Sequence, residues 1–171
     1  MRKYSSGHAN RGMGLERIMD LTNEIYRRKG LAVVSKAATP WKVQRSRQTG
    51  KVINAFPEKK STVDYHGTAN GVSLYFDAKM TKETSRFPLS NVEHHQYEYL
   101  KDMHNQGAKC FLLIEFSEFR KVHLLKYEDL HQWWELMAQG GRKSIPYDWI
   151  AENCQQVKQN GFVPVDYLEA L

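Results

Sequence analysis

An alternating stretch over residues 72–79 constrains the fold more than any other part of the chain. Every second residue from Val72 to Ala78 is apolar, whereas the residues between them, from Ser73 to Lys79, include two charged side chains. A period of two predicts a β-strand with one apolar face and one polar face. Such a strand must bury its apolar face against other elements, so a layered fold is expected.

Periodicity in the rest of the chain predicts helices and strands in mixed order. Strands are predicted at residues 31–34, 72–79, 110–114 and 122–125, and helices at residues 12–29, 90–106 and 128–138 and from Pro146 onwards, with Trp149, Ile150 and Val157 inside. Ser90 and Glu93 have the spacing of a capping box, and residues 65–67 are typical of a turn. The last two strands are expected to pair as a hairpin. No repeat or low-complexity linker interrupts this order, which predicts a single α/β domain over residues 1–171.

Composition narrows the class of protein. Of the 171 residues, 41% are hydrophobic and 26% charged, which is ordinary for a globular domain and excludes wholesale disorder. No apolar run approaches the ~18 residues of a membrane-spanning helix, and residues 1–8 lack the apolar segment of a signal peptide. Two cysteines, Cys110 and Cys154, exclude a disulfide framework and a cysteine-based zinc module. We therefore expect no membrane association and a reducing, cytoplasmic location.

Most of the net positive charge lies in one segment. Residues 42–60 contain six cations and one acid, which accounts for five of the six net positive charges. The cations are Lys42, Arg45, Arg47, Lys51, Lys59 and Lys60. Apolar residues interleave with them after Pro40, so a protruding hairpin or arm is expected over residues 41–60. It is either a solvated basic loop or a surface that contacts nucleic acid, with cations on phosphates and aromatic rings on bases.

Two aspartates and a lysine have the spacing of a hydrolytic site. Asp77 and Lys79 share the polar face of the predicted strand, and Asp64 lies thirteen residues before Asp77. Converging at one sheet edge, the carboxylates would suit Mg²⁺, which prefers oxygen ligands. The lysine would position a water molecule or stabilise the transition state of phosphodiester hydrolysis. The alternative is an ordinary Asp–Lys pair on an exposed strand face.

Glu16 and Gln96 extend the hydrolytic hypothesis. Glu16, on the first predicted helix, is either an acid favoured by the helix dipole or a third carboxylate near the metal. Gln96, near the inward stripe of the second helix, either satisfies a backbone group or holds the attacking water. The adjacent His94 and His95 do not have a convincing zinc spacing and are expected on the surface or facing DNA.

Six short segments then stand out in order along the chain. They are residues 10–16 (NRGMGLE), 61–67 (STVDYHG), 76–79 (FDAK), 87–89 (FPL), 95–96 (HQ) and 141–145 (GRKSI). Together they resemble the motifs of the RecU Holliday junction resolvases, from about Asn10 to the C-terminus. This combination is far more specific than the Asp-x-Lys pattern alone.

The resemblance implies a restriction-endonuclease-like, PD-(D/E)xK fold, in which a central mixed sheet is flanked by helices. It implies that residues 41–60 form a basic stalk inserted between strands, which enters the centre of the junction. It further implies a homodimer that resolves four-way DNA junctions by paired symmetric nicks during recombination and repair. The implied cofactor is Mg²⁺, with Mn²⁺ as a substitute.

The resemblance also assigns roles by position. The residues it implies are the metal ligands Asp64 and Asp77, the catalytic residues Lys79, Glu16 and Gln96, and Arg11, which would contact phosphate near the cut. Two positions depart from the family pattern: Asp77 stands where glutamate is frequent, and Val63 where threonine often precedes the first aspartate. Recombination proteins are further candidate partners, none of which the sequence identifies.

Three functions are therefore compared. The first is a junction-resolving endonuclease that recognises DNA shape, and the second is a restriction-type nuclease that cuts linear duplex. A stalk argues against the second, because a linear duplex offers no opening for it. The third is a non-catalytic recombination mediator that binds junctions. Intact Asp64, Asp77 and Lys79 argue against the third, because a pure binder does not need carboxylates facing phosphate.

Overall fold

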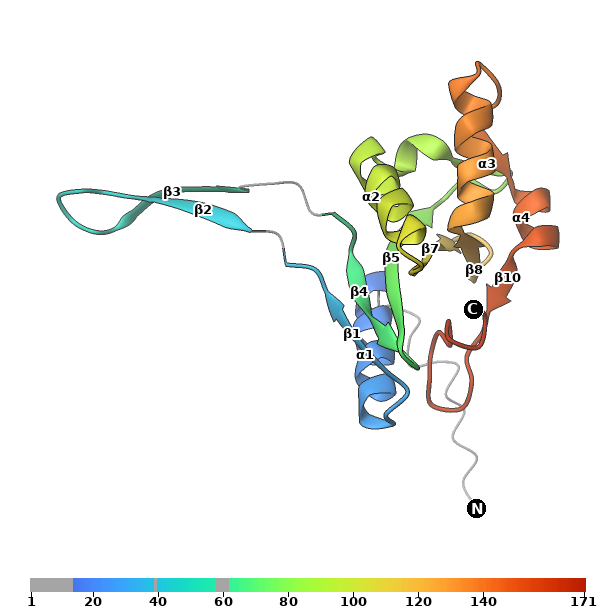
Figure 1. Ribbon diagram of the computed structural model, residues 1–171, viewed down its shortest axis with the longest axis horizontal. Coiled ribbons are helices and arrows are strands. Elements are labelled where there is room, and N and C mark those ends of the chain that lie inside the picture. The colour runs from blue at the N-terminus through green and yellow to red at the C-terminus, as the bar shows by residue number, and fades with distance from the viewer. Residues whose placement is uncertain (1–13, 39, 58–61) are drawn as a thin grey trace.

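The computed structural model describes residues 14–38, 40–57 and 62–171, and its centre is a six-stranded sheet (Figure 1). The strand order is β1 (Ala32–Lys36), β4 (Tyr65–Ala69), β5 (Val72–Thr81), β7 (Lys109–Phe116), β8 (Lys121–Lys126) and β10 (Gln155–Val157). β5 and β7 are parallel, whereas the other neighbouring pairs are antiparallel. The expected mixed sheet and the expected hairpin, β7–β8, are therefore confirmed.

Helices cover both faces of this sheet. α1 (Leu15–Arg28) and the C-terminal segment pack on one face, and α2 (His94–Asn105), α3 (Tyr127–Ala138) and α4 (Tyr147–Asn153) pack on the other. Alternation along β5 produces the two layers, because Phe76 is buried on the α1 side and Tyr75 packs on the α2 side. Among the described residues, no helix is long and apolar enough to cross a membrane.

Stacked aromatic rings make the α1 layer a firm support for the sheet. The ring of Phe76 stacks on Tyr65 and Phe111, with centroid distances of 5.0 and 4.6 Å. The C-terminal segment joins this cluster through Tyr167, which is fully buried and donates a hydrogen bond to Asn23 of α1 at 2.6 Å. The strands that carry the charged motif residues therefore rest on a well-packed core.

The prediction of a turn at residues 65–67 is wrong, because these residues begin β4. The signal for this strand was present in the dipeptide Asn70–Gly71, where both φ angles are positive, as a tight hairpin turn requires. β4 lies between β1 and β5 and pairs with both. The five residues of β4 include His66 and Gly67 and have little strand propensity of their own. Their extended conformation therefore depends on pairing with β1 and β5.

Two predictions about helix ends are also wrong. Ser90 does not cap the second helix, because it lies in a short 3₁₀ segment, η2 (Leu89–Asn91). Glu93 is the N-cap instead, and it forms a capping box with Gln96. Val157 does not belong to the last helix, because α4 ends at Asn153 and Val157 lies on β10.

The basic segment forms a hairpin that is a separate sheet. β2 (Trp41–Arg45) and β3 (Val52–Pro57) pair with each other, and Figure 1 shows them extending away from the body. Large apolar side chains on it are exposed, with Ile53 at 69%. The four cations in its described part, Lys42, Arg45, Arg47 and Lys51, are exposed as well. We call residues 41–57 the stalk hairpin; Lys59 and Lys60 lie outside the described residues.

One close backbone approach determines how β1 and β4 pair. Gly67 lies opposite Val34, and a Cβ atom on it would stand 2.2 Å from the Val33 carbonyl oxygen and 2.6 Å from Val34 Cα. Only glycine allows the two strands to approach this closely. The last residue of β1, Lys36, is thereby placed opposite Tyr65, next to Asp64 in the sequence.

Candidate active site

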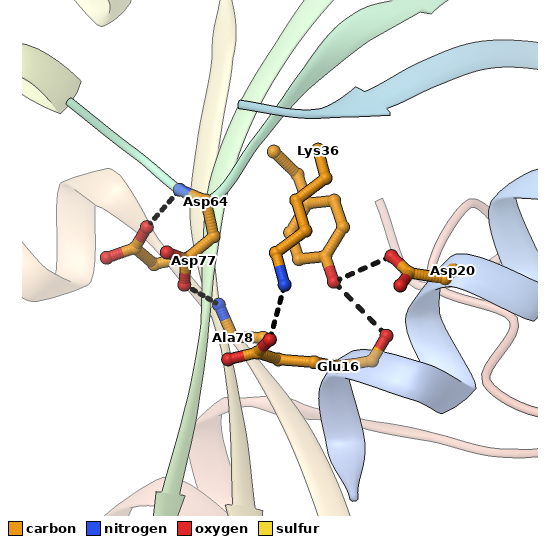
Figure 2. Close-up of polar contacts among 7 residues, drawn as sticks. Glu16, Asp20, Lys36, Asp64, Asp77 and Ala78 are labelled. Atoms are coloured by element: carbon orange, nitrogen blue, oxygen red, sulfur yellow. Dashed lines mark hydrogen bonds and ion pairs between the residues drawn. The ribbon is translucent and has the colours of Figure 1, made fainter. Parts of the chain in front are cut away.

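Asp64 and Asp77 are held face to face by two backbone hydrogen bonds. The Asp64 N–H donates to Asp77 Oδ1 at 2.6 Å, and the Ala78 N–H donates to Asp64 Oδ2 at 3.3 Å (Figure 2). The register of β4 and β5 explains this, because Tyr65 pairs with Phe76 and Asp64 directly precedes Tyr65. The two carboxylates are therefore oriented by the sheet and not by flexible loops.

Lys79 links this pair to the helix layer. Its Nζ forms an ion pair with Asp77 Oδ2 at 2.9 Å and donates to Gln96 Oε1 at 2.8 Å. The same Gln96 oxygen accepts the Glu93 N–H at 3.2 Å, so Gln96, the partner of Glu93 in the capping box, also fixes the lysine. Asp77 is fully buried and Lys79 is 15% exposed, so the pair is largely shielded from water.

The convergence of Asp64, Asp77 and Lys79 agrees with the hydrolytic hypothesis, but its position differs from the expected one. The residues do not lie at a sheet edge, because β5 has β4 on one side and β7 on the other. The alternative of an exposed strand face is wrong, since the Asp77 side chain is completely buried. Burying an aspartate is costly even when, as here, a lysine and a backbone N–H compensate its charge, and carboxylates buried in this way are frequent at functional sites.

Glu16 approaches the aspartates from the opposite layer. Its exposed carboxylate pairs with Lys36 of β1, and Figure 2 shows this pair beside the two aspartates. Beside it, the Tyr65 hydroxyl lies 3.1 Å from Asp20 Oδ1 and 3.2 Å from the Glu16 carbonyl oxygen. α1 is therefore fastened to β4 at the point where Glu16 faces the site.

Lys36, Asp20 and Tyr65 were missed by the sequence analysis. The only local signal for Lys36 is a cation at the end of a short apolar strand, and this does not reveal which residues it faces. Arg11 lies outside the described residues. His94 is exposed and His95 partly exposed, as expected, and they line a groove of about 720 Å³ beside the start of α2.

The electrostatics of the site favour a cation. Burial, together with the neighbouring charge of Asp77, raises the pKa of Asp64 to about 6, even though the charge of Lys79 acts in the opposite direction. On the other side, the Glu16 carboxylate raises the pKa of Lys36. The two lysines, Lys79 and Lys36, therefore neutralise only part of the charge of Asp64, Asp77 and Glu16.

The donor chemistry suits a hard divalent cation. Asp77 Oδ2 is buried and accepts no hydrogen bond, although Lys79 lies beside it, and Asp64 supplies a second carboxylate. The described residues hold no group of three or more His, Cys, Asp or Glu side chains arranged around a metal position. Water, backbone oxygens and substrate phosphate would therefore complete the coordination, as is usual for Mg²⁺.

A mixed sheet flanked by helices, with Asp64 facing an Asp77-x-Lys79 strand, defines the class of restriction-endonuclease-like nucleases. The model of one family, "RecU: Recombination protein U", matches residues 10–171. The chain belongs to the RecU family.

Individual relatives agree with this assignment. A protein named Holliday junction resolvase RecU from Levilactobacillus brevis is 37% identical over 176 residues, which covers 99% of this chain and 88% of the relative. The protein of the same name from Geobacillus kaustophilus is 35% identical, with coverage of 99% and 87%. A solved structure of Archaeoglobus fulgidus Hjc, a Holliday junction resolvase, matches with a TM-score of 0.42 and 12% identity, over 78% of this chain and 92% of that chain. This last similarity is too weak to support an inference.

Proposed function

We propose that this protein is a Holliday junction resolvase, a divalent-metal-dependent endonuclease that nicks four-way DNA junctions symmetrically during homologous recombination and repair. The observation that carries the proposal is the oriented set of Asp64, Asp77 and Lys79 near the base of an exposed cationic hairpin. The chain also belongs to the RecU family, and its relatives are named Holliday junction resolvases, which supports the same function.

Asp64 and Asp77 would hold Mg²⁺, for which Mn²⁺ can substitute. When bound, the metal lowers the pKa of a water molecule and neutralises charge on the scissile phosphate. Lys79, fixed by Asp77 and Gln96, presents its ammonium to the oxygen on which negative charge develops. Gln96 uses its Oε1 for Lys79 and the Glu93 N–H, so its Nε2 is the group that would face water or phosphate.

The opposite wall of the site orients the substrate. Glu16 would take part from α1, where it is paired with Lys36. Lys36 is 47% exposed, so it can exchange this carboxylate for a phosphate oxygen when DNA arrives. Arg11 would add a phosphate contact near the cut.

The stalk hairpin would make the enzyme selective for junctions. Its exposed cations would meet phosphates at the opening between the four arms, and Lys59 and Lys60 would continue this charge. Two cuts related by symmetry need two sites, and a homodimer with a two-fold axis matches the symmetry of the junction. We place the enzyme in the cytoplasm, where its two buried free cysteines would stay reduced.

The proposal is tested with a labelled four-way junction that has a mobile core, beside a linear duplex. Paired symmetric nicks in Mg²⁺, absent in EDTA, are expected from a protein that sediments as a dimer. Tight junction binding without nicks in Mg²⁺ or Mn²⁺ would instead favour the mediator function. Cleavage of the linear duplex at equal rate would favour a restriction-type nuclease.

Removing the stalk charges is expected to reduce discrimination between DNA forms. The triple variant Arg45→Ala, Arg47→Ala and Lys51→Ala should lower the ratio of junction to duplex affinity about tenfold at fixed salt. Arg45 also donates to the Gly50 carbonyl at 3.2 Å, so the double variant R47A/K51A separates charge from the structure of the tip. An unchanged affinity ratio in both variants would contradict the role of the stalk.

Metal binding is expected to depend on pH through Asp64. Because the pKa of this carboxyl is raised to about 6, it is mostly protonated at pH 5 and must lose its proton to bind a cation. The affinity for Mn²⁺, measured by calorimetry, should therefore rise about tenfold between pH 5 and pH 7. Asp64→Asn should bind weakly at both pH values, and equal affinity of the natural protein at both would contradict the prediction.

A further inference from the structure

The segment that follows α3 has no role in the site described so far. It contains Arg142 and Lys143, two neighbouring exposed cations. Within the described part of the chain, neither side chain has an ion pair or hydrogen bond. Two exposed cations on a flexible loop would be ordinary. They indicate a binding surface only if the fold holds their backbone in one position.

The backbone of this segment is fixed at both of its ends. At the α3 end, the Gly141 N–H donates to the Leu136 carbonyl at 2.9 Å, and a Cβ atom on Gly141 would stand 2.7 Å from that oxygen. Gly140 before it has a φ of +86°, which glycine adopts without strain. The turn after α3 therefore depends on two consecutive glycines, and it delivers Arg142 at a defined point.

The other end is tied to the elements that lead to the catalytic lysine. β9 (Ser144–Pro146) pairs with β6 (Arg86–Pro88) through the fully buried Ile145 and Phe87. Next to this pair of strands, the N–H of Leu89, which follows β6, donates to the carbonyl of Lys143, which precedes β9, at 3.1 Å. η2, which starts at Leu89, runs directly into the capped start of α2, where Gln96 holds Lys79.

A polar groove lies between these elements and the end of β5. It has a volume of about 560 Å³ and is lined by Met80 and Lys82 on one side and by Pro88 and Asn91 on the other. The first of its lining residues, Met80, directly follows Lys79 in the sequence. Lys82 is exposed and, among the described residues, unpaired, whereas the groove's one acid, Glu83, pairs with Arg86 at 3.5 Å.

We propose that Lys82, Arg142 and Lys143 form a second phosphate-binding surface, which we call the distal strip. The strip binds the DNA arm that extends from Lys79 in the direction away from the stalk hairpin. Figure 1 shows the loop after α3 on the other side of the body from the stalk hairpin. This deepens the proposed nuclease function and rests on it. DNA is the favoured occupant because Lys82 directly follows β5, the strand that carries Lys79, and because exposed cations on a fixed backbone suit the regular spacing of phosphates.

The strip makes a prediction that differs from that for the stalk. Contacts to the phosphates of an arm carry no information about the junction centre, so R142A/K143A should weaken junction and duplex binding by the same factor, about tenfold at low salt. The slope of log affinity against log salt concentration should become less steep by about two, one for each lost phosphate contact. K82A, on a different element, should reduce the slope by about one.

The matched control is K29A/K158A, which removes two exposed lysines that lie outside the strip. Thermal melting of all variants, expected within about 2 °C of the natural protein, checks the fold. If R142A/K143A and K82A bind duplex with the affinity and salt slope of the control, the distal strip is overturned. Because the readout is binding to linear duplex, the strip is tested even if junction preference and cleavage, which test the proposed function, are absent.

Discussion

Asp77→Asn is expected to lower the rate of junction cleavage by at least about 10³-fold while junction affinity changes less than about twofold. Asparagine keeps an oxygen for the Asp64 N–H, which Asp77 Oδ1 accepts at 2.6 Å, so the β4–β5 geometry is retained. It removes the charge that would hold the metal, and it turns an amide toward Lys79, whose Nζ stands 2.9 Å from Asp77 Oδ2. The loss therefore falls on catalysis and not on binding.

The measurement is single-turnover cleavage of a labelled junction in Mg²⁺, together with binding in Ca²⁺ or EDTA. Lys79→Met should behave like Asp77→Asn, because it removes the other half of the same ion pair. Asp148→Asn, which changes an exposed carboxylate on α4, is the matched control and should cleave normally. Cleavage by Asp77→Asn within about tenfold of the control would refute the assignment of the site.

Gly67→Ala is expected to have the largest effect on stability. The added methyl group would stand 2.2 Å from the Val33 carbonyl oxygen, and backbone atoms cannot move aside as a flexible side chain can. We expect a loss of about 3 kcal/mol in the free energy of unfolding, which corresponds to a melting temperature lower by about 6–12 °C. β1 should shift away from β4, and the Lys36–Glu16 pair beside the site should be displaced with it.

Thr68→Ala provides the comparison for this variant, because Thr68 is the next residue on β4 and is exposed. It should melt within about 2 °C of the natural protein. Thermal melting followed by circular dichroism distinguishes the two variants. Equal melting temperatures for Gly67→Ala and Thr68→Ala would show that β1 can accommodate a Cβ atom at this position.

Local patterns predicted the parts of the fold that are long and periodic. β5 and α1 follow from alternation and helical spacing, because each has enough residues for its period to appear, and β7 follows from its continuous apolar run. β6, β9 and β10 have three residues each, and what makes them strands is a partner distant in sequence. The capping box was placed three residues early, because Ser90 has the right chemistry but lies within η2, before the helix begins.

The candidate site shows the same difference between local patterns and distant contacts. Asp77 and Lys79 could be placed on one face from their spacing alone. Asp64, Glu16 and Gln96 were candidates from their positions in the sequence, and the resemblance to the family then assigned their roles. Their detailed contacts could not be predicted, because these depend on the register between strands. Lys36 reaches Glu16 only because β1 pairs with β4, and Gln96 meets Lys79 only because α2 packs over β5.

The separateness of the stalk hairpin has a consequence for how such enzymes can diverge. β2 and β3 form a sheet of their own, whereas the register between β1 and β4 is determined by Gly67 and its neighbours. Residues can therefore be inserted into or deleted from the hairpin without shifting the strands that carry Lys36 and Asp64. Under the proposed function, the reach of the hairpin toward DNA could change during evolution while the catalytic residues stay in place, so that targeting and catalysis would vary separately.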